Sequence, residues 1–214
     1  MYNEALIQSI TNKVIQVLAE NNKVSVPVGI SNRHIHISEA DLHTLFGEGY
    51  KLTKYSDLKQ PGQFASNELV TLRGPRGSVE RVRILGPVRA ETQIELSVSD
   101  GFKLGVPTPI RESGKIDGTP GIEIVGPRGR VVKDNGVIAA LRHIHMPKNI
   151  ADKYQLEDKS FVDVQVDGVR KATLSQVLLR VSEKFELEMH LDMDEANAVC
   201  LKNGDIVTIN KDNL

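Results

Sequence analysis

Two short stretches of the chain repeat one pattern, an arginine followed by two histidines on either side of an isoleucine. They are Arg33-His34-Ile35-His36 and Arg142-His143-Ile144-His145. Because side chains alternate along an extended strand, both histidines of each stretch project to one face. Four of the six histidines of the chain lie in these two stretches. Neutral imidazole is the commonest side-chain ligand of a metal such as zinc, so the repeat predicts two strands that present a metal centre.

The alternative is that these histidines are ordinary ones, either exposed or hydrogen-bonded in the core. Two near-copies favour ligands, because clusters of histidines and carboxylates mark metal or catalytic sites. The single cysteine, Cys200, excludes an internal disulfide and a four-thiolate site, so any zinc has to be held by histidines and carboxylates. We expect Cys200 to be a small core residue at a helix end, and His43 to be an exposed helical histidine.

The composition is that of a globular chain without features of a nucleic-acid or membrane protein. Its 214 residues are 40% apolar and 26% charged, which suits one large domain or two small ones. The formal net charge is -1 and only 4% of the residues are aromatic, so neither a basic field nor stacking platforms for nucleic acid are evident. No apolar run has the length of a membrane span and no secretory signal is recognisable, so we expect a cytosolic protein with no membrane partner.

Residues 2–20 have the apolar spacing of an amphipathic helix. The apolar positions recur at intervals of four and three residues, at Leu6, Ile10, Val14 and Val17. Polar residues 21–23 then break the pattern. The helix is either a cap packed on the domain or a docking helix for a groove on a partner.

Three histidines are each followed by the same succession of a strand end and a short helix. After His36, Ser38 is the expected N-cap of such a helix. Helices are expected in the same way after His145 and after His190, where Asp194 is the expected cap. Helix N–H donors and the positive end of the helix dipole would favour an anionic ligand at these three points.

The segment between the two histidine pairs is predicted to be rich in short strands. They are expected at residues 68–72, 79–85, 92–98, 121–125 and 137–140, whereas residues 53–66 are expected to form an exposed loop. Many short strands with few helices suggest small barrels. The predicted fold is therefore mainly β, with two small β-barrels, short helices and an N-terminal amphipathic helix.

Four charged residues of this segment are further candidates for a site. Glu95 shares a strand face with Gln93, away from the expected core, and is a candidate metal ligand. Arg89 follows a Gly-Pro turn and is either a solvated surface residue or an oxyanion ligand, since a guanidinium fork matches phosphate geometry. Arg81 and Arg83 alternate on one face, as a basic strip for a phosphorylated ligand or as a solvated strand face.

Four separated motifs follow one another in a characteristic order along the chain. They are Gly29–Ser38, Leu85–Glu95, Arg142–Met146 and Glu188–Asp192, the last followed by Asp194–Asn197. Together they resemble the phosphate propanoyltransferase family, the phosphotransacylases associated with propanediol-utilisation microcompartments. The resemblance runs from about Pro27 to Ile209, nearly the whole chain.

The resemblance implies two interleaved β-barrels around a dinuclear zinc site. One barrel would comprise residues 23–32 and 141–214, and the other residues 33–140, after an N-terminal segment of residues 1–22. Two zinc ions per chain would be held by His34, His36 and Glu95, and by His143, His145 and His190. Phosphate would bind the catalytic residue Arg89. Coenzyme A would contact Ile30, Ser31, Asn32, Arg76, Arg83 and Asn197. The ligand set alone leaves zinc, cobalt and nickel open.

The implied activity is that of an acyltransferase, in which phosphate attacks propanoyl-CoA directly to give propanoyl phosphate and CoA. The alternatives are an acetyl-CoA-preferring phosphotransacylase, a zinc-dependent thioester or phosphoester hydrolase, and a non-catalytic pair of zinc-stabilised barrels that binds a partner. We also expect a homo-oligomer, located in the cytosol or in a microcompartment lumen, where residues 2–20 would bind shell proteins. Arg33 and Arg142 have no implied role and are expected to pair with nearby acids.

Overall fold

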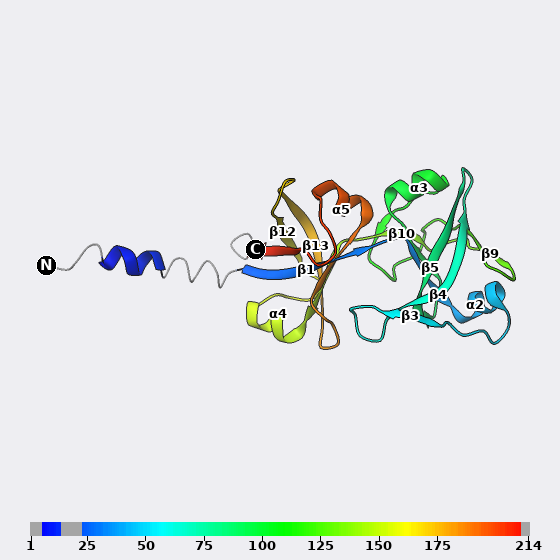
Figure 1. Cartoon of the computed structure of the whole chain (residues 1–214), viewed down its shortest axis with the longest axis horizontal. Coiled ribbons are helices and arrows are strands. Elements are labelled where there is room, and N and C mark those ends of the chain that lie inside the picture. Colours follow the sequence, from blue (N-terminus) through cyan, green and yellow to red (C-terminus); the bar gives the residue numbers. More distant parts are fainter. Residues whose placement is uncertain (1–5, 14–22, 211–214) are drawn as a thin grey trace.

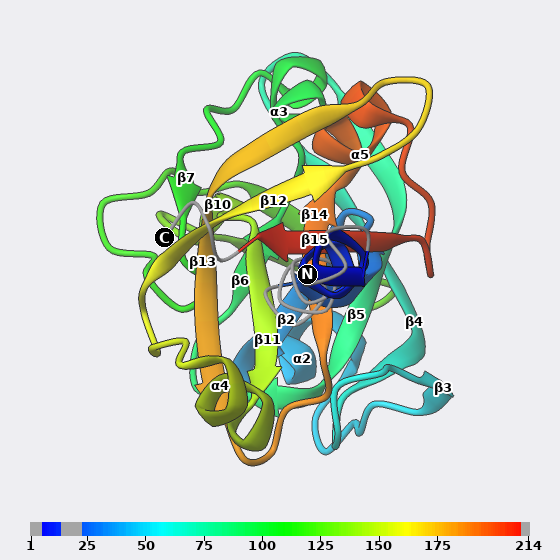
Figure 2. The same ribbon diagram turned by 90° about the vertical axis from the view of Figure 1, so that its left-hand side faces the viewer.

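The fold consists of two β-sheets that lie side by side along the long axis of the molecule (Figure 1). The computed structural model describes residues 6–13 and 23–210. The first sheet is a closed barrel, made in this order by β1 (Lys23–Ser31), β14 (Glu188–Asp192), β11 (His143–Pro147), β13 (Ala172–Ser182), β12 (Phe161–Val166) and β15 (Ile206–Asn210). Figure 2 shows this barrel in front of the second sheet.

The second sheet is a curled half-barrel. Its strands follow the order β7 (Ile110–Arg111), β10 (Val137–Ala140), β6 (Gln93–Glu95), β2 (His34–Ser38), β5 (Ser78–Arg89), β4 (Phe64–Arg73), β8 (Glu123–Val125) and β9 (Arg130–Val132). A further strand, β3 (Lys54–Asp57), pairs with β4. The predicted mainly β fold is confirmed, and the second sheet is open at β7 and β9 rather than closed.

The chain crosses between the two sheets at two points. Asn32 and Arg33 connect β1 of the barrel to β2 of the second sheet, and Leu141 and Arg142 connect β10 of the second sheet back to β11 of the barrel. The first strand therefore pairs with strands from the last third of the chain. Both crossings come directly before a His-x-His stretch, so both stretches begin at the boundary between the sheets.

Each sheet has its own apolar core. In β2, Ile35 and Ile37 are fully buried in the core of the second sheet, and in β11 Ile144 and Met146 are fully buried in the barrel. Burial of each such side chain contributes about 1.5–3 kcal/mol to the free energy of folding. Side chains alternate along a strand, so this burial fixes the direction of the histidines. Their side chains point away from the two cores, to the opposite face of each strand.

Four short helices follow strands of the two sheets. They are α2 (Glu39–Phe46), α3 (Val98–Leu104), α4 (Lys148–Tyr154) and α5 (Met193–Val199). The predicted N-cap is confirmed for α2, where Ser38 Oγ accepts a hydrogen bond of 3.2 Å from the backbone N–H of Asp41. The prediction for α5 was wrong by two residues: Asp192 caps the helix, and Asp194 lies in its first turn. Asp192 forms a capping box with Glu195, which satisfies N–H groups at both residues.

Three local predictions need correction. The expected loop of residues 53–66 contains β3 and the start of β4. Cys200 is exposed rather than part of the core, and it ends α5 in the left-handed conformation, with a φ of 59°. His43 is helical as predicted, but its side chain is only 21% exposed and lies 3.4 Å from the carboxylate of Glu48.

Residues 6–13 form an exposed helix that Figure 1 shows at a distance from both sheets. The rest of the amphipathic helix predicted for residues 2–20 lies outside the described residues. Within the described residues, no helix has the length and apolar character needed to cross a membrane.

Candidate active site

The two sheets place their histidine strands in equivalent surroundings. In the second sheet, β2 lies between β6, which is antiparallel to it, and β5, which is parallel. In the barrel, β11 lies in the same way between the antiparallel β14 and the parallel β13. The register puts Glu95 opposite His34 and His190 opposite His143. Two histidines and one residue from the antiparallel neighbour therefore meet in each sheet.

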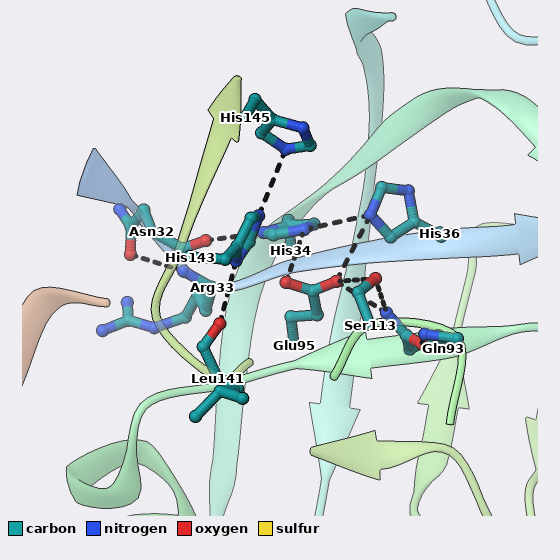
Figure 3. A network of polar contacts seen from close by, with 11 residues as sticks. Asn32, Arg33, His34, His36, Gln93, Glu95, Ser113, Leu141, His143 and His145 are labelled. Carbon is teal, nitrogen blue, oxygen red and sulfur yellow. Dashed lines mark hydrogen bonds and ion pairs between the residues drawn. The ribbon is translucent and has the colours of Figure 1, made fainter. Parts of the chain in front are cut away.

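The first cluster consists of His34, His36 and Glu95, all of them buried (Figure 3). The Nε2 atoms of His34 and His36 are 3.2 Å apart. Oε2 of Glu95 lies 3.4 Å from Nε2 of His34, and Oε1 lies 3.5 Å from Nε2 of His36. The carboxylate thus spans the pair of imidazoles.

The second cluster consists of His143, His145 and His190. The Nε2 atoms of His143 and His145 are 3.1 Å apart, and the ring centroid of His190 lies 5.1 Å from that of His143 and 4.8 Å from that of His145. In each cluster, the three potential ligand atoms lie within 4.8 Å of one another. The structure therefore brings the six predicted metal ligands together in the two predicted groups of three.

The spacing of these atoms fits a tetrahedral metal. Zinc bonds of about 2.0–2.1 Å place two ligand atoms of a tetrahedron roughly 3.3–3.4 Å apart. The nitrogen and oxygen pairs of the first cluster are separated by 3.2–3.5 Å, and the close nitrogen pair of the second by 3.1 Å. The first cluster and the close histidine pair of the second therefore have the spacing of zinc ligands, and three ligands per cluster would leave a fourth position open.

Hydrogen bonds to the backbone fix the orientation of one imidazole in each cluster. Nδ1 of His34 donates to the carbonyl of Asn32, and Nδ1 of His143 donates to the carbonyl of Leu141, each over 2.8 Å. Because a carbonyl can only accept, the proton of each neutral ring lies on Nδ1 and the lone pair lies on Nε2. Nδ1 of His145 is the one buried side-chain polar atom without a hydrogen-bond partner in the part of the chain that the structure describes.

Burial keeps three of the imidazoles neutral. It lowers the pKa of His36 to about 4, although the contact with Glu95 opposes this shift. Burial, together with the charge of neighbouring groups, lowers the pKa of His143 to about 4 and that of His145 to about 2. Burial alone would raise the pKa of Glu95, but the adjacent histidines and the Ser113 hydroxyl outweigh it and hold this pKa well below its ordinary value. At neutral pH the clusters therefore offer lone pairs and a carboxylate.

Equivalent residues support the third member of each cluster. Gln93 Nε2 donates to Oε1 of Glu95 over 2.6 Å, and the Ser113 hydroxyl donates to the same oxygen over 3.0 Å. In the barrel, Nε2 of His190 lies 2.8 Å from Oε2 of Glu188. Glu188 stands opposite His145 as Gln93 stands opposite His36. The sequence prediction missed these supporting roles, although both residues precede the candidate ligand by two positions.

Both clusters open on one cavity of about 710 Å³ between the sheets. Five of the residues predicted to bind coenzyme A or phosphate line it, namely Ile30, Ser31, Asn32, Arg83 and Arg89. The other two predicted contacts, Arg76 and Asn197, are not part of this lining. Arg76 packs against Gly105 after α3, and Asn197 is exposed on α5.

Three candidate arginines line the cavity, Arg81, Arg83 and Arg89, and the last two differ in their surroundings. The guanidinium of Arg83 donates to the carbonyl of Ser66 and lies 4.7 Å from the centroid of the Tyr55 ring. Arg89 is the last residue of β5 and lines the cavity. Burial lowers the pKa of Arg89, Glu95 opposes this shift, and the positive charge of Arg180 adds to it. Arg180 also lines the cavity, and the sequence prediction missed it.

The two arginines at the crossings pair with acids, as predicted. Nε of Arg33 lies 2.8 Å from Oδ2 of Asp100, and Nη1 of Arg142 lies 3.0 Å from Oε1 of Glu195. Arg142 also donates to the carbonyl of Ser175. Each arginine thus attaches a crossing to the helix that follows β6 or β14, beside a cluster.

Comparison with known proteins agrees with the four motifs. The phosphate propanoyltransferase family matches residues 27–202. The chain is similar to phosphate propanoyltransferases of Rhodopseudomonas palustris, at 55% identity over 87% of this chain and 82% of the relative, and of Thermotoga maritima, at 56% identity over 85% and 87%. It is also 46% identical to a phosphate propanoyltransferase of Rhodobacter capsulatus, over 99% of this chain and the whole of the relative.

Proposed function

The chain belongs to the phosphate propanoyltransferase family, and on that basis we propose that it transfers the acyl group of propanoyl-CoA to phosphate, reversibly, at a dinuclear zinc site. One observation carries the proposal. Two clusters with three potential ligands each, one per sheet, open on the same cavity as Arg89. This arrangement suits a reaction in which an anion attacks a neutral carbonyl group.

The proposed reaction balances without a covalent enzyme intermediate. An oxygen of hydrogen phosphate attacks the thioester carbon, a carbon–oxygen bond forms, and the carbon–sulfur bond breaks. The proton of hydrogen phosphate goes to the departing thiolate, so the products are propanoyl phosphate and CoA. Cys200, the single cysteine, is exposed at the end of α5 and is not part of the cavity lining, so it is not suited to act as a nucleophile.

The chain provides the metal ligands and the phosphate site. His34, His36 and Glu95 would hold one zinc, and His143, His145 and His190 the other. When bound, zinc supplies Lewis-acid stabilisation of the charge that develops on the thioester oxygen and on the departing sulfur. Arg89 binds phosphate through two parallel N–H donors and thereby directs one phosphate oxygen at the carbonyl carbon.

Coenzyme A is proposed to enter along the residues before the first histidine pair. Ile30, Ser31 and Asn32 line the cavity next to His34, and Arg83 lies on the neighbouring strand β5, opposite His34. These positions would place the thioester beside both clusters. Contacts of Arg76 and Asn197 with coenzyme A stay predictions from the family resemblance, since both side chains lie outside the cavity lining.

The placement of the protein in the cell is also a proposal. We propose that residues 1–22 form a segment separate from the two barrels, which comprise residues 23–32 with 141–214, and residues 33–140. The exposed helix at residues 6–13 supports a role of this segment in binding the shell of a microcompartment. The proposed homo-oligomer is tested by sedimentation of the full chain.

The phosphate dependence of CoA release tests the proposed function. We expect the zinc-loaded protein to release CoA from propanoyl-CoA at a rate that saturates with phosphate. Replacement of Arg89 by alanine should raise the KM for phosphate. Release at the same rate without phosphate would instead indicate a thioester hydrolase, and an unchanged rate in Arg89→Ala would exclude the proposed phosphate site. A series of acyl-CoA substrates distinguishes an acetyl from a propanoyl preference.

A further inference from the structure

Arg180 lies on the opposite sheet from Arg89 and lines the same cavity. Arg180 belongs to β13 of the barrel, where it stands opposite His145 on β11. Arg89 ends β5 of the second sheet, and both side chains are part of the cavity lining. The cavity therefore receives guanidiniums from both sheets, from Arg81, Arg83 and Arg89 of β5 and from Arg180 of β13.

The side chain of Arg180 is held in place beside the second cluster. Its guanidinium lies 5.8 Å from the centroid of the Phe185 ring. The Phe185 ring in turn packs edge-on against the His145 ring, with centroids 4.4 Å apart. The Arg180 side chain is 27% exposed, so much of it is removed from solvent. A stacked, half-buried guanidinium loses little freedom when it binds an anion.

The charge of Arg180 is poorly compensated by the protein. Among the described residues, its one close acidic neighbour is Glu112, with Nε 4.0 Å from Oε1. Glu112 is already shared with two lysines: Lys159 contacts the same carboxylate oxygen, and Lys115 lies 3.2 Å from the other. One carboxylate thus faces three cations, and positive charge remains at the cavity.

The positive charge of Arg180 also acts on Arg89. After burial, the charge of Arg180 contributes to the lowered pKa of Arg89. Two cations that share a cavity repel each other unless an anion lies between them, and a dianion would compensate both.

We propose that Arg180 is a second phosphate-binding residue, so that each sheet contributes one guanidinium to the phosphate dianion of the substrate and of the acyl phosphate product. The proposal rests on the proposed function and deepens it by adding a specificity-determining residue. Two guanidiniums from different sheets distinguish a doubly charged phosphate from a singly charged carboxylate. They also fix the anion relative to both clusters.

Replacement of Arg180 should weaken the binding of phosphate and leave the binding of propanoyl-CoA nearly unchanged. A hydrogen bond to a charged group contributes about 1.5–3 kcal/mol, which corresponds to roughly 10- to 100-fold in affinity. Replacement of Arg180 by alanine should therefore raise the KM for phosphate about 10- to 100-fold and leave the KM for propanoyl-CoA within about twofold. Arg180→Lys keeps the positive charge but not the planar pair of N–H donors. Its KM for phosphate should therefore lie between those of wild type and Arg180→Ala.

The experiment compares four zinc-loaded full-length proteins: wild type, Arg180→Ala, Arg180→Lys and the control Arg130→Ala. Arg130 lies on β9, is 71% exposed and pairs with Glu123 away from the cavity. Phosphate is titrated at saturating propanoyl-CoA, and propanoyl-CoA at saturating phosphate. Calorimetric titration with inorganic phosphate alone measures binding directly and does not depend on turnover.

The expected result is weaker phosphate binding in Arg180→Ala by both methods, partial recovery in Arg180→Lys, and no change in Arg130→Ala. Unchanged phosphate binding in Arg180→Ala, or a rise in the KM for propanoyl-CoA instead, would overturn the proposal. The latter would assign Arg180 to coenzyme A. If wild type releases CoA without phosphate, the proposed function fails, whereas the calorimetric comparison still decides the role of Arg180. If Arg180→Ala does not fold, the comparison of Arg180→Lys with wild type decides it by the same criteria.

Discussion

Glu95 lies opposite His34 in the β2–β6 pair, just as His190 lies opposite His143 in the β11–β14 pair. One strand arrangement is thus used twice, with a carboxylate as the third ligand candidate in the second sheet and an imidazole in the barrel. The first cluster carries a negative charge and the second does not. The two sites share no ligand, so each should form without the other.

Removal of one histidine per cluster should therefore remove one metal at a time. We expect two metal ions per chain in the purified protein and one in each of the variants His36→Ala and His145→Ala. The control is His43→Ala, because His43 lies in α2 outside both clusters, and this variant should keep two. Elemental analysis after gel filtration gives the count. Loss of both metals from either single variant would contradict two independent sites.

The metal-free protein should lose stability as the pH falls from about 6.5 towards 4. An unfolded histidine protonates near pH 6.5, whereas in the folded state burial lowers the pKa of His36 and of His143 to about 4. Between these values the unfolded chain binds more protons than the folded chain, so the free energy of unfolding falls as the pH falls.

Denaturant unfolding of metal-free protein at pH 6.5, 5.5 and 4.5 measures this dependence. Carboxylates whose pKa is lowered in the folded state, such as Glu95, add to this dependence only below about pH 5, where the unfolded carboxylate begins to protonate, so the interval from pH 6.5 to 5.5 reports the histidines. The variant His36→Asn should show a shallower dependence than wild type. A free energy of unfolding that is constant over the window would show that the buried imidazoles are not responsible for acid sensitivity.

Arg142 should matter for stability and not for phosphate. Its guanidinium links the crossing before β11 to Glu195 of α5 and to the carbonyl of Ser175. Arg142→Ala should lower the free energy of unfolding by about 1–2 kcal/mol, as expected for lost hydrogen bonds to a half-buried charged group. Thermal and denaturant unfolding measure this change, with Arg130→Ala as an exposed control within about 0.5 kcal/mol of wild type. A raised KM for phosphate in Arg142→Ala would indicate a role in the site instead.

Deletion of residues 1–20 should leave the two sheets and the activity intact. The described part of this segment, residues 6–13, is exposed and lies away from both sheets in Figure 1. We expect the same melting temperature and turnover as in the full chain, and loss of co-purification with shell particles. If the shortened protein does not fold, the segment is a structural cap of the domain.

The sequence predicted the local features of the site better than the long-range ones. The period of two in a strand was enough to place His34 and His36 on one face, because Ile35 and Ile37 fill the core. Which strand supplies the third ligand depends on pairings between distant segments. The strand pattern made Glu95 a candidate ligand, but only the family resemblance assigned Glu95 and His190 to the two groups. The sequence therefore predicts which residues of one strand share a face, but not which strands pair to complete the site.

Arg180 illustrates what local patterns miss. It lies on β13, a strand that was not predicted, and it reaches the cavity because β13 pairs in parallel with β11. The cap of α5 shows the same limit at short range: β14 ends at Asp192, so this residue precedes the helix and its carboxylate reaches the N–H of Glu195.

Identification of the acyl product with and without phosphate shows whether phosphate attacks the thioester directly. Zinc-loaded protein is incubated with propanoyl-CoA, and CoA, propanoyl phosphate and propanoate are each quantified. Direct attack by phosphate predicts that CoA and propanoyl phosphate form in equal amounts when phosphate is present, and that CoA release is negligible when it is absent. Release of CoA with propanoate at the same rate under both conditions would exclude direct attack by phosphate.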